Sequence, residues 1–79
     1  MHILLFAQIK DAVGASELEL KVTGQLDSGE VWARLIGLHP KLAPYQKTTR
    51  LARNGEYAGP QDLFEDADDV ALIPPVSGG

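Results

Sequence analysis

The side chains of this chain offer few groups for catalysis or metal binding. It contains no cysteine, no set of nucleophile, histidine and acid, and no glycine-rich loop for a phosphate. We interpret His2 as a surface residue, and His39 has no histidine, cysteine or carboxylate at ligand spacing. Four carboxylates fall within residues 65–69, but they lack the alternation and the glycine of a calcium-binding loop, so a solvated turn is the simpler interpretation. The sequence predicts no bound metal and no bound cofactor.

The group that remains is the carboxylate at the end of the chain. After an apolar run come two prolines and four slender residues, which are Pro74, Pro75, Val76, Ser77, Gly78 and Gly79. The proline rings fix φ near the polyproline value, so this segment should leave the domain extended and semi-rigid. Glycines have no Cβ and let a backbone pass through a slot that excludes side chains. The pattern predicts that residues 74–79 form an extended tail that carries the Gly79 carboxylate into another protein.

An ordinary frayed end is the alternative for such a terminus. Chain ends are usually disordered, and Gly-Ser endings are common in linkers. Here the glycines follow a rigid proline pair and an apolar strand, and the last four residues can span about 13 Å, roughly the depth of an enzyme pocket. Ordering the tail costs about 1–2 kcal/mol per residue, so the domain behind it must supply the docking energy.

Length and composition narrow the class of protein. A chain of 79 residues forms one domain with a modest core, without room for a deep active site of its own. The net charge of −4 and the pI near 4.9 argue against nucleic-acid binding, which needs clustered lysine and arginine. An acidic surface suits a partner with a basic face, or serves solubility alone. Without cysteine, a signal pattern or a long apolar run, the chain is expected to be cytoplasmic, with no membrane contact.

Apolar patterning predicts the elements of the first part of the chain. Residues 2–7 are expected to form a buried central strand, and residues 9–14 suggest a short helix that is closed by Gly14. Residues 17–23 alternate strictly between polar and apolar side chains, which is typical of a half-buried strand. This strand should pair with the first one as an antiparallel hairpin.

A longer helix is predicted next. Asp27 or Ser28 suits the N-cap, and Glu30 completes a capping box when Asp27 is the cap. Pro40 ends the helix because it disfavours helical geometry at His39. The apolar stripe of this helix should cover one face of a sheet, and it consists of Val31, Trp32, Leu35, Ile36 and Leu38.

A second hairpin follows an irregular connection at residues 42–47. Asn54 and Gly55 are the preferred pair for a type I′ turn, so strands are expected at residues 48–53 and 56–58.

The end of the chain completes the predicted fold. Leu63 and Phe64 should fill the core, and the apolar run at residues 70–73 is typical of a strand buried on both faces. To bury the apolar runs near both ends, the first and last strands should lie parallel in the middle of a mixed sheet, with the helix across one face. The sequence thus predicts an α+β, β-grasp (ubiquitin-like) fold in a single domain spanning residues 1–79.

Both ends of the chain resemble one protein family. Residues 71–79, Ala-Leu-Ile-Pro-Pro-Val-Ser-Gly-Gly, resemble the C-terminal signature of the small, sulfur-carrying subunit of molybdopterin synthase, a ubiquitin-like β-grasp protein. Residues 4–14 resemble the first strand and following turn of that family, and the order of the elements between is compatible. Lys10 and Asp11 stand where the family usually has arginine and glutamate. The charges are kept, although lysine lacks the bidentate fork of arginine.

The resemblance implies a route for the Gly79 carboxylate. A free carboxylate resists nucleophiles because its charge opposes attack and oxide is a poor leaving group. In the implied route, an adenylating enzyme uses ATP to activate Gly79, and a sulfur donor converts the adenylate to a thiocarboxylate. The tail then enters the large synthase subunit, where its sulfur is transferred twice to cyclic pyranopterin monophosphate to form the dithiolene of molybdopterin. The resemblance implies that the small subunit is no enzyme by itself, since the acid and base groups belong to the large subunit. The small subunit contributes tethered sulfur at high effective concentration.

The resemblance also implies where partners dock. The family's apolar contacts correspond by motif position to Phe6, Tyr57 and Ile73, each of which could equally belong to the core. Phe6 and Ile73 follow Leu5 and Leu72, so a two-faced sheet should bury one residue of each pair under the helix and leave its neighbour for a partner. The expected partners are the large synthase subunit, in a heterotetramer, and the adenylating enzyme.

Other functions stay open at the level of the sequence. A sulfur carrier for thiamine thiazole or tungsten-cofactor synthesis would use the same tail chemistry, although the Pro-Pro-Val-Ser lead-in favours molybdopterin. A ubiquitin-like modifier would form the same adenylate and end as an isopeptide bond on lysines. A plain interaction domain would carry the glycines only as a flexible end.

Overall fold

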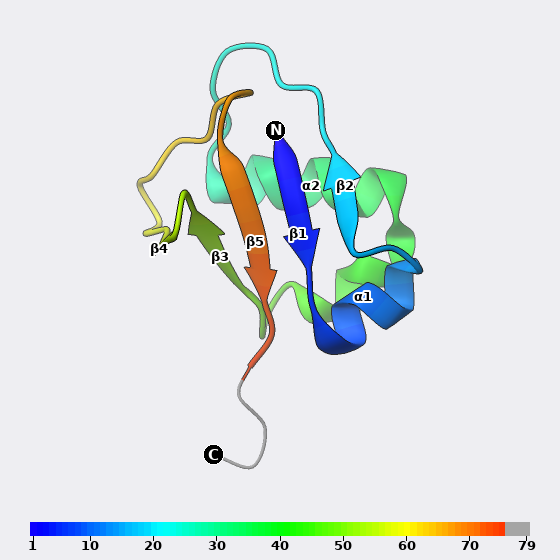
Figure 1. Ribbon diagram of the computed structural model, residues 1–79. Helices are drawn as coiled ribbons and strands as arrows, with labels where there is room; N and C mark the ends of the chain where they lie inside the picture. The colour runs from blue at the N-terminus through cyan, green and yellow to red at the C-terminus, as the bar shows by residue number, and fades with distance from the viewer. Residues whose placement is uncertain (76–79) are drawn as a thin grey trace.

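The computed structural model describes residues 1–75 and consists of a twisted sheet with helices against one side (Figure 1). Its elements, in chain order, are β1 (His2–Leu5), α1 (Ala7–Val13), β2 (Glu17–Glu19), α2 (Ser28–Leu38), the 3-10 helix η1 (Pro40–Tyr45), β3 (Arg50–Arg53), β4 (Glu56–Tyr57) and β5 (Asp69–Ile73). No helix within these residues is long and apolar enough to cross a membrane.

The sheet has the order β2-β1-β5-β3-β4, with the first and last strands at its centre. β1 and β5 are parallel, and Leu4 lies opposite Ala71. The other pairings are antiparallel: β2 with β1, β3 with β5, and β4 with β3. The predicted β-grasp fold is confirmed, including the central parallel pair and the helix across one face.

The core lies between the sheet and α2. Val31 and Leu35 of α2 are fully buried, and so are Ile3 of β1 and Leu72 of β5. Burying each of these side chains stabilises the fold by about 2 kcal/mol relative to leaving it in water. Trp32 belongs to the same cluster, as predicted.

The start of α2 is the predicted capping box. The side chain of Asp27 accepts a hydrogen bond from the Glu30 amide at 2.8 Å, and Glu30 Oε1 accepts one from the Asp27 amide at 3.1 Å. The prediction that Leu38 continues the buried stripe is wrong, because this side chain is 60% exposed. The last turn of α2 lies beyond β2 at the edge of the sheet (Figure 1), and Leu42 from η1 fills the core instead.

β2 is shorter than predicted and ends at Glu19 rather than continuing to residue 23. Beyond Glu19, the Leu20 amide still donates to the Met1 carbonyl at 2.9 Å. The Val22 amide donates instead to Asp66 Oδ1, at 2.9 Å. The predicted alternation still holds, because Leu20 and Val22 are both buried.

The predicted helix cap at Gly14 and the predicted type I′ turn at Asn54 and Gly55 are both present. α1 ends at Gly14, whose φ of 84° is left-handed and whose amide donates to Lys10 O at 2.8 Å. Asn54 and Gly55 have φ of 51° and 89°, the paired positive values that a type I′ turn requires. The hairpin strands are shorter than predicted, since β3 begins at Arg50 and β4 ends at Tyr57.

Leu63 and Phe64 are adjacent residues that differ in burial. Phe64 is fully buried, because its backbone pairs with Leu26 through hydrogen bonds of 2.7 and 2.9 Å that turn its side chain inward. Adjacent side chains of extended backbone point to opposite sides, so Leu63 is turned outward and is 43% exposed. The prediction that Leu63 fills the core is therefore wrong.

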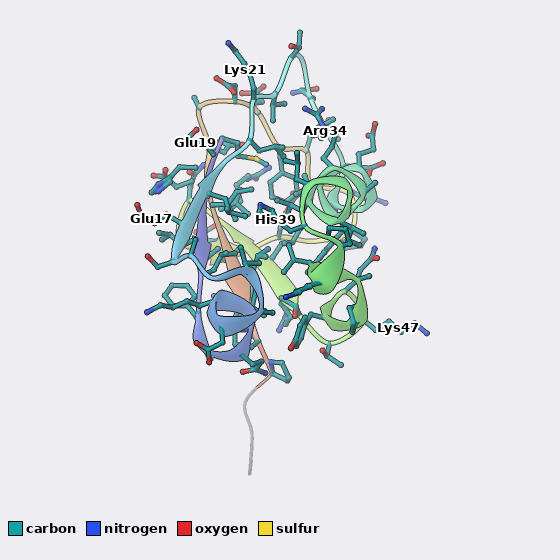
Figure 2. All side chains as sticks on the ribbon, turned by 90° about the vertical axis from the view of Figure 1, so that its right-hand side faces the viewer. Glu17, Glu19, Lys21, Arg34, His39 and Lys47 are labelled. Atoms are coloured by element: carbon teal, nitrogen blue, oxygen red, sulfur yellow. The ribbon has the colours of Figure 1, made fainter. Side chains whose placement is uncertain are left out.

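The prediction that the last strand is buried on both faces is also wrong. Val70 and Leu72 are buried, whereas Ala71 and Ile73 are only partly covered. β1 shows the same alternation. The described helices pack on one face of the sheet (Figure 2), so every second residue of the central strands faces away from them.

Candidate functional site

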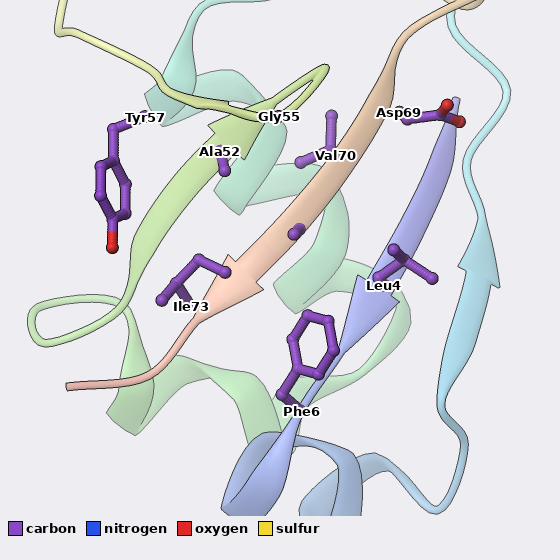
Figure 3. Close-up of a pocket in the computed structure, with 9 residues that line it drawn as sticks. Leu4, Phe6, Ala52, Gly55, Tyr57, Asp69, Val70 and Ile73 are labelled. Atoms are coloured by element: carbon purple, nitrogen blue, oxygen red, sulfur yellow. The ribbon is translucent and has the colours of Figure 1, made fainter. Parts of the chain in front are cut away.

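The face of the sheet opposite α2 carries an apolar depression of about 400 Å³ (Figure 3). We call this surface the open face. The depression is lined by Leu4, Phe6, Ala52, Gly55, Tyr57, Asp69, Val70, Ala71 and Ile73. Contiguous exposed apolar surface is typical of an interaction site rather than of a solvated face.

Phe6 borders the depression at the end of β1. Its backbone is extended, with φ −131° and ψ 155°, so its side chain continues the outward alternation of the strand. Phe6 is 44% exposed, whereas Leu5 beside it is 2% exposed. Ala7 then takes a left-handed φ of 49°, at the point where the chain turns from β1 into α1. This turn leaves Phe6 at the rim of the open face.

Ile73 borders the depression at the end of β5, directly before the predicted tail. It is partly covered, while Leu72 beside it is fully buried. Pro74 and Pro75 follow outside any strand, and Pro75 is exposed. Figure 1 shows that the chain leaves the sheet at the end of β5, away from the N-terminus. The other predicted tail residues, Val76, Ser77, Gly78 and Gly79, lie outside the described residues.

Tyr57 completes the predicted set from β4. Its partner across the hairpin is Ala52, and its side chain is 57% exposed. The three predicted interface residues therefore share one face and one depression, although Phe6 directly follows β1, Tyr57 belongs to β4 and Ile73 to β5. Their assignment as a partner interface stays a prediction.

Arg50 is a residue of this face that the sequence analysis did not identify. Its guanidinium carbon lies 4.0 Å from the centroid of the Tyr57 ring. A cation stacked on an aromatic ring at an exposed site contributes about 0.5–1 kcal/mol. The register of the second hairpin indicates this contact. Ala52 lies opposite Tyr57, and Arg50, two residues before Ala52, is the diagonal neighbour of Tyr57 on the same side of the sheet.

The charges of the open face are divided between its two ends. His2 lies between two carboxylates, with Nε2 3.5 Å from Glu17 Oε1 and Nδ1 3.7 Å from Asp69 Oδ1. This acidic end is where β5 begins. Arg50 pairs with Ile73, so the positive charge lies where β5 ends and the tail departs.

The acidic turn at residues 65–69 has a structural role rather than a metal-binding one. Asp66 Oδ1 accepts hydrogen bonds from the Val22 amide and from the Met1 ammonium group, and these contacts lower the pKa of Asp66. Asp68 accepts from the Glu65 amide and from Asn54 Nδ2, which lowers the pKa of Asp68. Within residues 1–75, no group of three or more histidines and acids is arranged to hold a metal ion.

Comparison with known proteins gives consistent results for the whole chain. The molybdopterin synthase sulfur carrier subunit of Chlamydomonas reinhardtii is 37% identical over 81 residues, which cover 100% of this chain and 98% of the relative. The crystal structure of SAMP1 from Haloferax volcanii superposes with a TM-score of 0.82 at 30% identity, covering 100% and 98% of the two chains.

A second similar structure is a complex of subunits 1 and 2 of molybdopterin-converting factor from Helicobacter pylori, with a TM-score of 0.68, 20% identity and coverage of 99% and 96%. At this identity the likeness shows the fold alone. The sequence model of the ThiS family matches residues 3–79. The match spans both central strands, the open face and the predicted tail, and this chain therefore belongs to the ThiS family, with the ubiquitin-like β-grasp fold of its sulfur carrier relatives.

Proposed function

We propose that this protein is the sulfur carrier subunit of a molybdopterin synthase. The observation that carries the proposal is the position of the apolar depression, which borders Ile73 directly before the Pro74-Pro75 pair. A partner that covers the depression also receives the tail that starts beside it. The identity of 37% to a molybdopterin synthase sulfur carrier subunit, over the full chain, supports the assignment of the pathway.

The reacting group in this proposal is the Gly79 carboxylate. An adenylating enzyme joins it to the α-phosphate of ATP, and pyrophosphate leaves. A sulfur donor then supplies the equivalent of hydrosulfide, the carbon–sulfur bond forms, and AMP leaves with the original carboxylate oxygen. The product is a thiocarboxylate, whose sulfur is a far better nucleophile than the oxygen that it replaces.

The second half of the proposed reaction takes place in the large subunit. The thiocarboxylate sulfur forms a bond to a carbon of cyclic pyranopterin monophosphate as a carbon–oxygen bond at that carbon breaks, and the oxygen leaves as water or stays on the opened phosphate. Water then cleaves the resulting thioester, so that Gly79 returns as a carboxylate and the sulfur stays on the pterin. Two such transfers supply the two sulfur atoms of the dithiolene. This chain contributes tethering and delivery, and the acid and base groups belong to the large subunit.

Docking of both partners is assigned to the open face. The apolar contacts are supplied by Phe6, Tyr57 and Ile73, which line the depression. Burial of these side chains by the partner offsets the entropy that is lost when the tail is ordered. The identity to a relative that is named a subunit of molybdopterin synthase supports a large-subunit partner. The adenylating enzyme is proposed from the chemistry, since a carboxylate needs activation before sulfur can add.

Intact-mass measurement tests the proposal. The full-length chain is incubated with ATP, an adenylating enzyme from the same organism and a sulfide source. We expect a gain of about 16 Da from the exchange of oxygen for sulfur at Gly79. A chain that lacks Gly79 is the control and should gain nothing. Addition of the large subunit and cyclic pyranopterin monophosphate should then return the mass to its starting value and form molybdopterin.

A protein modifier is the second candidate function. It is favoured by the likeness to the structure of SAMP1 from Haloferax volcanii and to the sequence of small archaeal modifier protein 1 from the same organism. In this case the adenylate would be captured by lysine amines, and conjugates of other proteins would appear in cell extract supplied with ATP. Conjugates in place of the sulfur-dependent mass gain would contradict the carrier proposal. A carrier for thiamine thiazole or a tungsten cofactor would gain the mass without forming molybdopterin.

A further inference from the structure

Arg50 differs in charge from the other side chains of the open face. The strand register assigns ten side chains to this face, namely those of His2, Leu4, Glu17, Glu19, Arg50, Ala52, Tyr57, Asp69, Ala71 and Ile73. Arg50 is the one among them with a permanent positive charge. It is exposed, and none of the ion pairs formed by residues 1–75 involves it.

The stack on Tyr57 holds the guanidinium in a defined place. The guanidinium carbon lies over the Tyr57 ring, 4.0 Å from its centroid. When an arginine stacks on an aromatic face, its N–H donors point outward in the guanidinium plane. Stacking therefore limits the motion of a long side chain without using its donors. An arginine fixed in this way is prepared to bind a planar anionic group through two parallel hydrogen bonds.

We propose that Arg50 pairs with a carboxylate of the docking partner, beside the opening that receives the tail. The inference deepens the proposed function and rests on it, because it names the chemistry of the surface that covers the open face. The partner must present apolar side chains to the depression and an Asp or Glu carboxylate at the end of β5. Salt-bridge formation here selects partners and fixes the direction of docking.

The acidic end of the open face favours one orientation of the docked partner over the reverse one. Glu19 and Asp69 lie level with the start of β5, and Arg50 lies where β5 ends. The carboxylate of Glu17, which lies opposite Leu4, reaches the acidic end through its 3.5 Å contact with His2. A partner docked in the reverse orientation would place its carboxylate against three others, and like charges brought together at an interface disfavour that arrangement. The correct orientation places the opening of the partner at Pro74.

The same charges decide which anion Arg50 binds. A nucleic acid or an anionic membrane would bring many negative charges across the whole face, next to Glu17, Glu19 and Asp69. The net charge of −4 opposes such polyanions further. A single carboxylate can reach Arg50 without meeting the acidic end. The apolar depression beside Arg50 also matches a protein surface better than a polyanion.

Calorimetric titration against the purified large synthase subunit of the same organism tests the inference, with the full-length chain at low and at moderate salt. Arg50→Gln removes the charge and keeps a polar side chain, and Arg50→Lys keeps the charge but weakens the stack. Lys47→Gln is the matched control, because it also removes one positive charge, on the helix side of the sheet (Figure 2). Phe6→Asp tests whether the open face is used at all.

We expect Arg50→Gln to raise Kd about tenfold at low salt and to reduce its dependence on salt, with a smaller effect for Arg50→Lys and less than about a twofold effect for Lys47→Gln. Arg50→Glu should bind still more weakly and should be rescued when a carboxylate of the large subunit is changed to lysine. Circular dichroism should show that all variants are folded, since Arg50 is exposed.

Three other results would overturn the inference in different ways. If Phe6→Asp abolishes binding while Arg50→Gln binds like the wild type, the open face is the docking site but Arg50 makes no ion pair. If Arg50→Gln and Lys47→Gln weaken binding equally, only the net charge matters. If Phe6→Asp also leaves binding unchanged, the proposed docking face itself is wrong, and the failure lies with the proposed function rather than with Arg50 alone.

Discussion

Leu72 and Ile73 are consecutive residues of β5 whose side chains serve opposite faces of the sheet. Leu72 is fully buried beneath the helices, and Ile73 lines the apolar depression on the open face. One strand therefore joins the core directly to the surface from which the predicted tail departs. Substitutions at the two positions should separate stability from docking.

Leu72→Ala should lower the free energy of unfolding by about 3 kcal/mol, because it leaves a cavity in a fully buried site. Ile73→Ala should lower it by less than about 1 kcal/mol, since a partly covered site can lose atoms to water. Urea denaturation measures both values. Binding to the large subunit should be weakened by Ile73→Ala at temperatures where both variants are folded. A larger loss of stability for Ile73→Ala than for Leu72→Ala would contradict this division.

Deletion of Gly79 should abolish sulfur loading and leave the melting temperature unchanged. The expectation for stability follows from the core cluster of the described residues, whose last member is Leu72. Differential scanning calorimetry and intact mass measure the two effects on the same sample. Unfolding of the truncated chain would mean that the predicted tail is structural, and the proposed function would fail with it.

Acid should destabilise the fold through Asp66 and Asp68. Hydrogen bonds lower the pKa of both carboxyls in the folded state, first the bond from the Val22 amide to Asp66 and the bond from the Glu65 amide to Asp68. Groups with a depressed folded pKa contribute stability above their unfolded pKa of about 3.9 and lose it as the pH falls through the folded value. Thermal midpoints should therefore drop steeply below about pH 4.

The variant Asp66→Asn isolates one of these carboxyls. An amide does not titrate, so the acid-induced drop of the thermal midpoint should be shallower in this variant, and its stability at neutral pH should be lower. Asp11→Asn is the control, because Asp11 is exposed on α1 and accepts no hydrogen bond from a side chain or terminus within residues 1–75. Identical acid profiles for Asp66→Asn and the wild type would refute this role of the acidic turn.

Thr49→Val should stabilise the protein by about 1 kcal/mol. Within residues 1–75 the buried Oγ1 atom of Thr49 has no hydrogen-bond partner, and valine has the same shape without the hydroxyl. Thr48→Val is a matched control, since the Thr48 hydroxyl is exposed and lies 3.4 Å from Tyr45 O. Denaturant midpoints compare the two variants. A loss of stability in Thr49→Val would show that its hydroxyl is satisfied in solution.

Ala7→Val should destabilise the protein by about 1–2 kcal/mol, because Ala7 has a φ of 49° and a β-branched residue tolerates this region poorly. Ala7→Gly should be close to neutral, as relief of strain offsets the greater entropy of glycine in the unfolded chain. Urea denaturation of the two variants distinguishes these effects. Equal stability of the valine and glycine variants would contradict a left-handed Ala7.

The sequence by itself determined the elements whose causes are local. The capping box of Asp27 and Glu30, the type I′ turn at Asn54 and the left-handed cap at Gly14 each depend on a few adjacent residues, and all three are present. The alternation that buries Leu5 and exposes Phe6 is also local, since the period of a strand is two residues.

Only the tertiary structure decided which apolar residues are covered. Leu38 and Leu63 have the side chains of core residues, yet both are exposed, because the sheet ends before one and the Leu26–Phe64 bridge turns the other outward. Ala71 is likewise only partly covered, because the described helices pack on one face. Hydrophobicity is a property of the residue, whereas burial depends on what lies opposite it.

The open face combines both kinds of information. The family resemblance names Tyr57, but the contact of Tyr57 with Arg50 depends on the register of β3 and β4. The closeness of Phe6 and Ile73 depends in the same way on the pairing of β1 with β5, which joins residues almost seventy positions apart. Pairing at such separations is set by the burial of the whole sheet beneath α2, and no short stretch of sequence contains it.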